Sequence, residues 1–175
     1  MALTRRMFAQ LVASALLLRH LPALAQTPLT VAVGGTPGPN IIQRVVSAGA
    51  PADMLLLAVA PEKLVGLSSF DLSRQTAIPF HDDIRALPKL GRLAGRASIL
   101  SLEALLALKP DLVVDCGNAD ETWLSQARQV SAQTQIPWLL INGELRRTPE
   151  QLLAAGEALG VDSRARAQAR LRSEE

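Results

Sequence analysis

Side chains that could do chemistry are few in this sequence, and they lie far apart. His81, Asp82 and Asp83 form a run of donor types that bind metal ions. Neighbouring carboxylates rarely converge on one ion, and the only other histidine, His20, lies near the start of the chain. We therefore interpret this run as part of a solvated loop and assign no metal site to it.

The candidate nucleophiles also lack suitable partners. Cys116 is the single cysteine, and the only histidine after residue 25 is His81, in an unrelated segment. We predict that Cys116 is a small buried thiol at the end of a strand. Ser68 or Ser69 stays open as the nucleophile of a small exported α/β hydrolase, although neither lies in a G-x-S-x-G elbow. The residues favour a protein that is not an enzyme, and no cofactor is predicted.

The first residues indicate export from the cytoplasm. Arg5 and Arg6 precede an apolar run over 11–18, and Ala23-Leu24-Ala25 supplies the small residues that a signal peptidase needs. That run is too short to cross a bilayer, which takes about 20 residues. We therefore predict a twin-arginine signal peptide over residues 1–25, cleaved near Ala25, and a periplasmic location for the rest of the chain.

The charge of the remaining residues gives no reason to expect nucleic acid as a partner. Residues 1–25 contain three arginines and no acid, so the formal charge of +2 becomes −1 (2 − 3) without them. Apolar residues make up 49% of the chain and aromatic residues 3%, which indicates an aliphatic core. One cysteine excludes an internal disulfide framework. The remaining length suits one domain, which we expect to be a monomer.

Short apolar strands alternate with amphipathic helices along the chain. The pattern predicts strands at 29–33, 44–47, 64–67, 111–115 and 137–141, helices at 53–58, 100–108, 122–131, 150–159 and 163–173, and mostly loop over 71–96. In the helix over 100–108, Leu102, Leu105 and Leu106 form one apolar stripe, and Glu103 is turned away from it. This order predicts an α/β fold with a mainly parallel sheet flanked by helices, as in a Rossmann-like lobe.

The loops that follow the predicted strands are the expected binding region. In open parallel sheets, ligands bind beyond the carboxyl ends of the strands. Those ends are at 48–51, 68–70, 116–118 and 142–143.

One segment also resembles a known family. Residues 95–114 read Gly-Arg-Ala-Ser-Ile-Leu-Ser-Leu-Glu-Ala-Leu-Leu-Ala-Leu-Lys-Pro-Asp-Leu-Val-Val. This stretch resembles the signature of periplasmic substrate-binding proteins of ABC transporters for iron–siderophore, haem and cobalamin. Segments 44–47, 64–70 and 135–141 are similar to that family as well, so the resemblance extends over residues 44–172.

The resemblance implies two α/β lobes joined by a long helix, with cargo bound between the lobes. On this basis residues 26–160 are expected to form the N-terminal lobe and 161–175 the start of the connector helix. The second lobe would be absent, as in a truncated member of the family. The implied function is capture of an iron chelate, haem or cobalamin for an ABC permease in the inner membrane. The open alternative is an interaction module completed by a second chain.

The resemblance places cargo contacts on the strand-end loops, and a permease contact elsewhere. The cargo residues are Gly49, Ala50, Phe70, Arg96, Ala97, Cys116 and Gly117. Each has a structural alternative: the glycines can serve turn geometry, Phe70 can belong to the core, and Arg96 can be solvated. Glu103 occupies the Leu-Glu position, which implies contact with a permease arginine. Its alternative role is to complement the N-terminus of its own helix.

The paired arginines lead to the first prediction. Changing Arg5 and Arg6 to lysine should leave uncleaved precursor in the cytoplasm, because the twin-arginine translocase recognises the two residues as a pair. Immunoblotting of cytoplasmic and periplasmic fractions measures this. Normal periplasmic accumulation in a strain without that translocase would contradict the prediction.

Overall fold

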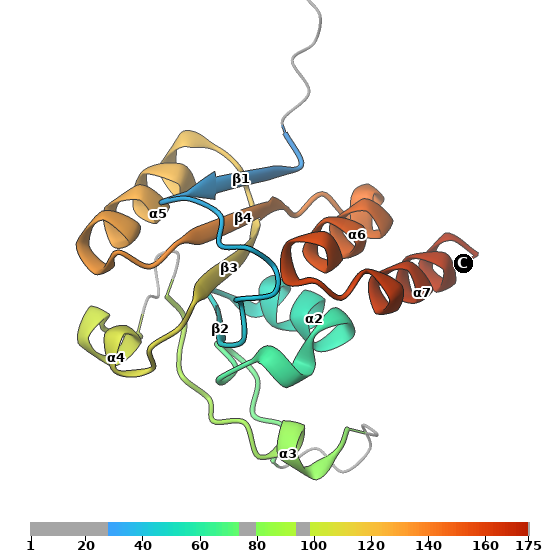
Figure 1. The fold of residues 1–175 in the computed structure, drawn as a ribbon, viewed down its shortest axis with the longest axis horizontal. Helices are drawn as coiled ribbons and strands as arrows, with labels where there is room; N and C mark the ends of the chain where they lie inside the picture. The colour runs from blue at the N-terminus through green and yellow to red at the C-terminus, as the bar shows by residue number, and fades with distance from the viewer. Residues whose placement is uncertain (1–27, 74–79, 94–98, 175) are drawn as a thin grey trace, which may run out of the picture.

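A four-stranded sheet forms the middle layer of the protein (Figure 1). The computed structural model describes residues 28–73, 80–93 and 99–174. The strands are β1 (Thr30–Val33), β2 (Val45–Ser47), β3 (Leu112–Gly117) and β4 (Trp138–Asn142), in the spatial order β1-β4-β3-β2. β2, β3 and β4 run parallel, whereas β1 pairs antiparallel with β4. The predicted α/β fold with a mainly parallel sheet is confirmed.

Helices cover both faces of the sheet. One face carries α2 (Ala50–Val59), α6 (Thr148–Leu159) and α7 (Asp162–Ser173), and the other carries α4 (Leu102–Ala107) and α5 (Glu121–Thr134). Side chains alternate along β3, so Leu112 and Val114 join the core under α2 and α6, while Val113 joins the core under α5. Short helices η2 (Pro61–Lys63), α3 (Asp82–Arg85) and η3 (Leu145–Arg147) lie in the connections.

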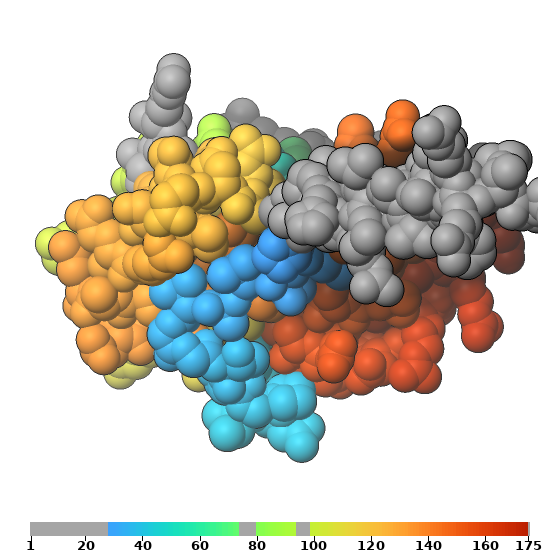
Figure 2. Space-filling view, turned by 90° about the horizontal axis from the view of Figure 1, so that it is seen from above, coloured from blue at the N-terminus to red at the C-terminus, as the bar shows by residue number. Residues whose placement is uncertain are grey.

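The edge strand β1 and the chain after it run across the surface of the molecule. Figure 2 shows this segment in blue and cyan, between α5 in orange and the C-terminal helices in red. None of the described helices is both long and apolar enough to pass through a membrane.

The predicted strand over 64–67 is wrong. Leu64 makes a single bridge to Val45, and Leu67 makes another to Lys89. The backbone of this segment shares its hydrogen bonds between two different neighbours. Val65 N donates to Val45 O at 3.1 Å, whereas Leu67 N donates to Pro88 O at 2.9 Å. A segment that changes partner after two residues cannot continue either ladder. The apolar pattern marked its burial correctly but not its pairing.

The predicted apolar stripe of α4 is also only partly correct. Leu105 is fully buried and Leu102 half-buried, but Leu106 is 47% exposed. Each residue turns a helix by about 100°, so Leu106 lies about 100° from Leu105 and only about 60° from Glu103. This short helix contacts the core along one line, which leaves Leu106 on the outer side beside Glu103. The expectation that Glu103 faces outward is confirmed.

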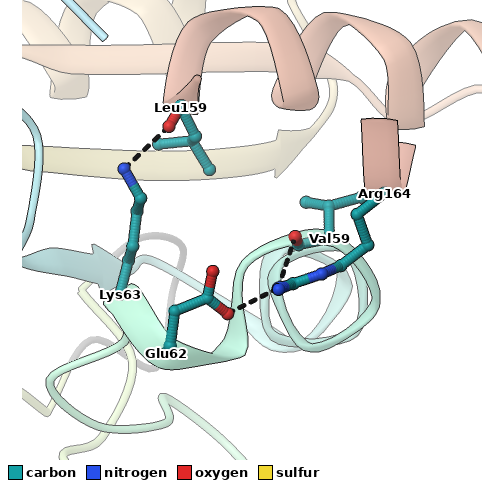
Figure 3. Close-up of polar contacts among 5 residues, drawn as sticks. All are labelled: Val59, Glu62, Lys63, Leu159 and Arg164. Carbon is teal, nitrogen blue, oxygen red and sulfur yellow. Dashed lines mark hydrogen bonds and ion pairs between the residues drawn. The ribbon is translucent and has the colours of Figure 1, made fainter. Parts of the chain in front are cut away.

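Charged side chains hold three helices of one face together (Figure 3). Lys63 Nζ donates to the carbonyls of Ile42 and Leu159, each at 2.7 Å. Arg164 donates to Val59 O at 3.0 Å and also pairs with Glu62. Because Leu159 and Val59 are the last residues of α6 and α2, these cations satisfy carbonyls at helix ends that have no partner within the helix. The α2, α6 and α7 helices are thereby fixed relative to one another.

The contact between α6 and α7 leads to the second prediction. A Cβ added at Gly156 would overlap the Cβ of Ala165. Gly156→Ala should therefore lower the free energy of unfolding by about 1–3 kcal/mol through overpacking, although alanine favours helices over glycine by about 1 kcal/mol. Urea denaturation measures the effect. The matched control, Gly156→Ala with Ala165→Gly, removes the overlap and should recover part of the loss; a single variant as stable as the parent would contradict the prediction.

Candidate functional site

The carboxyl ends of three strands meet at one edge of the sheet. Ala48 N, just after β2, donates to Val114 O at 2.9 Å. Gly143 N, just after β4, donates to Gly117 O at 2.8 Å. The loops at 48–51, 116–118 and 142–143 therefore share the edge that the sequence predicted.

Glycines shape this edge in two different ways. A Cβ on Gly143 would lie 2.9 Å from Gly117 Cα and 3.0 Å from Gly117 N, so only glycine lets these chains approach so closely. A Cβ on Gly117 itself would meet no atom within 4 Å. Gly117 thus presents open backbone at the end of β3, where a small molecule can approach it.

A mostly apolar cavity of about 290 Å³ lies beside this edge. It is lined by Pro51, Met54, Leu55, Ala58, Cys116, Gly143, Leu145, Thr148, Gln151, Leu152, Gln168 and Arg172. The strand ends contribute Cys116 and Gly143, and the helices α2, α6 and α7 provide most of the wall. Met54 is 65% exposed and Leu145 is 88% exposed, so apolar side chains also stand at the rim. Such a lining suits the apolar part of a small ligand.

Cys116 is a buried thiol at the end of a strand, as the sequence predicted. Burial, and then the nearby carboxyl of Asp115, raise the pKa of Cys116 to about 11. The thiol therefore keeps its proton at neutral pH, and a protonated thiol is a poor nucleophile and a poor metal ligand. Its contribution to the cavity is a small apolar surface.

Asp53 holds the loop that follows Leu67. Its fully buried carboxylate accepts hydrogen bonds from Ser68 N at 2.9 Å, Ser68 Oγ at 2.9 Å and Ser69 N at 2.8 Å. Ser68 is 1% exposed, so its hydroxyl is closed to substrate and does not fit the nucleophile of a hydrolase. Sequence analysis missed this role of Asp53. An acidic residue within an otherwise apolar helix was the available signal.

The structure brings some of the predicted cargo residues together. Gly49, Cys116 and Gly117 lie at the ends of the adjacent strands β2 and β3, and Ala50 begins α2. Phe70 is half-buried and packs against the core under α2, which agrees with its structural alternative. Arg96 and Ala97 lie outside the described residues, as do Arg5, Arg6 and Ala25 of the predicted signal peptide.

Among the described residues, the remaining acidic side chains form no cation site. His81 is exposed at the start of α3, and within the described ranges no three His, Cys, Asp or Glu side chains are placed to hold a metal ion. Asp115 is 4% exposed and, by the alternation of β3, faces α4 and α5 rather than the cavity. Its burial raises the pKa of Asp115 to about 6, against the opposing effects of the Cys116 N–H and the charge of Arg92.

Comparison with solved structures finds this fold in exported binding proteins. An ABC transporter solute-binding protein from Sulfurospirillum deleyianum matches with a TM-score of 0.62 and 24% identity, over 74% of this chain and 41% of that chain. A periplasmic heme-binding protein from Pseudomonas aeruginosa matches with a TM-score of 0.51 and 24% identity, over 76% and 44%. The periplasmic heme-binding protein RhuT from Roseiflexus sp. RS-1 matches with a TM-score of 0.51 and 23% identity, over 76% and 47%.

These likenesses establish the fold. It is the α/β lobe fold that the family resemblance of residues 95–114 implied. At identities of 23–24% they carry no conclusion about function. The chain spans less than half the length of each of these three proteins. No protein-family model matches the chain, and no curated protein matches it by sequence.

The buried carboxyl of Asp115 leads to the third prediction. Its pKa is raised from 3.8 to about 6, so the folded state binds this proton more tightly than the unfolded state. The contribution of Asp115 to the free energy of unfolding is fully present below pH ~4. It falls by up to about 3 kcal/mol as the pH rises from ~4 through ~6. Asp115→Asn should flatten that part of the profile and raise stability at pH 7.

Urea denaturation between pH 3.5 and 7.5 measures this effect. Asp83→Asn, at an exposed position, is the control and should keep the parental slope. If the profile of Asp115→Asn ran parallel to that of the parent, the assignment of the slope to Asp115 would be wrong.

Proposed function

We propose that this chain is the cargo-binding lobe of an exported solute-binding protein that delivers a small molecule to an ABC permease. The observation that carries the proposal is the mostly apolar cavity beside the carboxyl ends of the strands, to which Cys116 and Gly143 contribute. Solute-binding proteins of ABC transporters share this fold. Neither the protonated Cys116 nor the enclosed Ser68 favours covalent chemistry, so we propose binding without catalysis.

The proposed cargo is an iron chelate, haem or cobalamin, and haem has the most support. The wall of the cavity comes mainly from aliphatic side chains, and apolar Met54 and Leu145 stand at its rim. A cargo with a broad apolar surface gains more from such a wall than a hydrophilic chelate does. Two of the structural neighbours are heme-binding proteins.

We further propose that the site is periplasmic, reached through the predicted twin-arginine signal, and that Glu103 contacts the permease. Glu103 is exposed on α4, on the opposite face of the sheet from the helices that line the cavity. Hydrogen bonds from the Glu103 backbone and the Ser101 side chain hold the pKa of Glu103 below its usual 4.5. The carboxylate is therefore ionised at neutral pH and available to a cation.

The fourth prediction concerns cargo affinity. The cavity of about 290 Å³ is at the small end of ligand sites, which usually enclose about 300–1,000 Å³ and cover most of a ligand. This chain alone should therefore bind haem with a Kd in the micromolar to millimolar range, about −8 to −4 kcal/mol. Absorbance titration of the mature chain with haem, cobalamin and a ferric siderophore measures this affinity.

A blocking substitution tests where the cargo binds. Ala58→Phe places a ring at the wall of the cavity and should weaken binding at least about tenfold. Gly38→Phe is the control, since a Cβ there makes only ordinary contact with Ile41 and the residue does not line the cavity. Thermal unfolding confirms that both variants fold. Nanomolar affinity, no binding of any of the three cargoes, or full affinity in Ala58→Phe would each contradict the proposal.

A further inference from the structure

The cavity beside the strand ends carries a single charge. Among the described residues that line it, Arg172 is the only charged side chain, and none is acidic. A charge next to an apolar wall is screened less than a charge in open water, so it attracts an opposite charge more strongly there. The cavity therefore favours an anion over a cation.

The polar and apolar parts of the lining come from different helices. Gln168 and Arg172 are four residues apart on α7, so they are neighbours on one face of that helix. In contrast, α2 contributes only apolar side chains, which are Pro51, Met54, Leu55 and Ala58. The cavity is thus amphipathic, with hydrogen-bond donors along α7 and an apolar wall along α2.

A further amide in the lining has its orientation fixed by the backbone. Gln151 is only 5% exposed, and its Nε2 donates to Asn142 O at 2.8 Å and to Glu144 O at 2.7 Å. Two carbonyl acceptors decide which end of the amide is the nitrogen. Gln151 Oε1 accepts no hydrogen bond from the described residues, so this oxygen is the polar atom that Gln151 can offer to a ligand. Because it would repel a carboxylate, an anionic group is favoured at α7 instead.

Arg172 has the chemistry to hold a carboxylate. A guanidinium carries five N–H groups in a planar fork and can bind both oxygens of a carboxylate side by side. With five donors it can do so in addition to the interaction that Arg172 already makes within the protein. Gln168 is half-buried one turn earlier and supplies an amide N–H beside it.

We propose that Arg172 and Gln168 form a carboxylate subsite, and that the cavity selects an amphipathic carboxylate whose apolar part lies against α2. The inference rests on the proposed function, which supplies the cavity as the cargo site. It discriminates among the proposed cargoes, because haem carries two carboxylates on an apolar ring whereas the side chains of the cobalamin ring are amides. A cavity of about 290 Å³ would hold one edge of the haem rather than the whole ring.

A comparison of haem with its dimethyl ester tests the subsite. The ester keeps the ring and the iron but has no carboxylate. The mature chain should bind haem at least about tenfold more tightly than the ester, and this preference should shrink as salt rises. Arg172→Gln should remove most of the preference, and Arg172→Lys should keep part of it. Arg166→Gln is the matched control, because Arg166 is an exposed arginine of α7 that does not line the cavity. Absorbance titration measures each affinity.

A smaller pair of amphiphiles tests the subsite without haem. Octanoate and octanol have the same apolar chain and differ in the carboxylate. In two-dimensional NMR spectra of the mature chain, octanoate should shift the side-chain N–H signals of Gln168 and Arg172 and should bind several-fold more tightly than octanol. Gln168→Leu should reduce this preference, and thermal unfolding confirms that the variant folds.

The outcomes separate this inference from the proposed function. Equal affinity for haem and its ester, or an unchanged preference in Arg172→Gln, would overturn the carboxylate subsite even if haem is captured as proposed. A preference for octanoate in a chain that binds none of the three cargoes would support the subsite and refute the proposed capture. Octanol bound as tightly as octanoate, or an equal loss of preference in Arg166→Gln, would overturn the inference.

Discussion

The geometry at the carboxyl ends of the strands, the proposed binding edge, depends on one buried carboxylate. Asp53 lies in the first turn of α2, has no exposed surface, and accepts three hydrogen bonds from Ser68 and Ser69. A buried carboxylate is tolerated only when its oxygens are satisfied, and leaving it unpaired would cost several kcal/mol. The loop over 68–70 therefore cannot move away from α2. Since only Ala48 and Gly49 separate β2 from α2, the carboxyl end of β2, the start of α2 and this loop form one rigid unit.

A second constraint fixes the far wall of the cavity. The α6 and α7 helices pack closely because Gly156 leaves room for Ala165, and Lys63 and Arg164 tie their ends to η2 and α2. The walls of the cavity come from these same three helices. A ligand that enters this cavity thus meets a surface that is already assembled. The entropy cost of ordering the side chains of that surface arises on folding rather than on binding.

Local sequence patterns were enough to predict most elements, because the short apolar runs of β3 and β4 and the helical periods after them leave few alternatives. They also predicted which loops would meet at the carboxyl ends of the strands, since parallel strands bring these ends together. They failed where the answer depends on a distant partner. Residues 64–67 look like a strand, but the segment over 88–90 competes with β2 for their backbone. Leu106 belongs to an apolar stripe by spacing, yet α4 meets the core along Leu102 and Leu105 only, and Leu106 lies outside that line. The cavity was equally hidden, because its walls come from helices that are distant in sequence.

The sheet separates the two proposed contacts of this chain. The cavity lies on the side of α2, α6 and α7, and Glu103 lies on α4 on the other side. A cargo and a docked partner would therefore touch different surfaces and would not compete for space. Any energetic coupling between them must pass through the sheet, and β3 is a strand that lines the cavity on one face and packs under α4 and α5 on the other. Its Cys116 lines the cavity, while the adjacent Asp115 faces the layer of α4 and α5. Because the two residues are consecutive on one strand, a shift of β3 caused by cargo would move Asp115 as well.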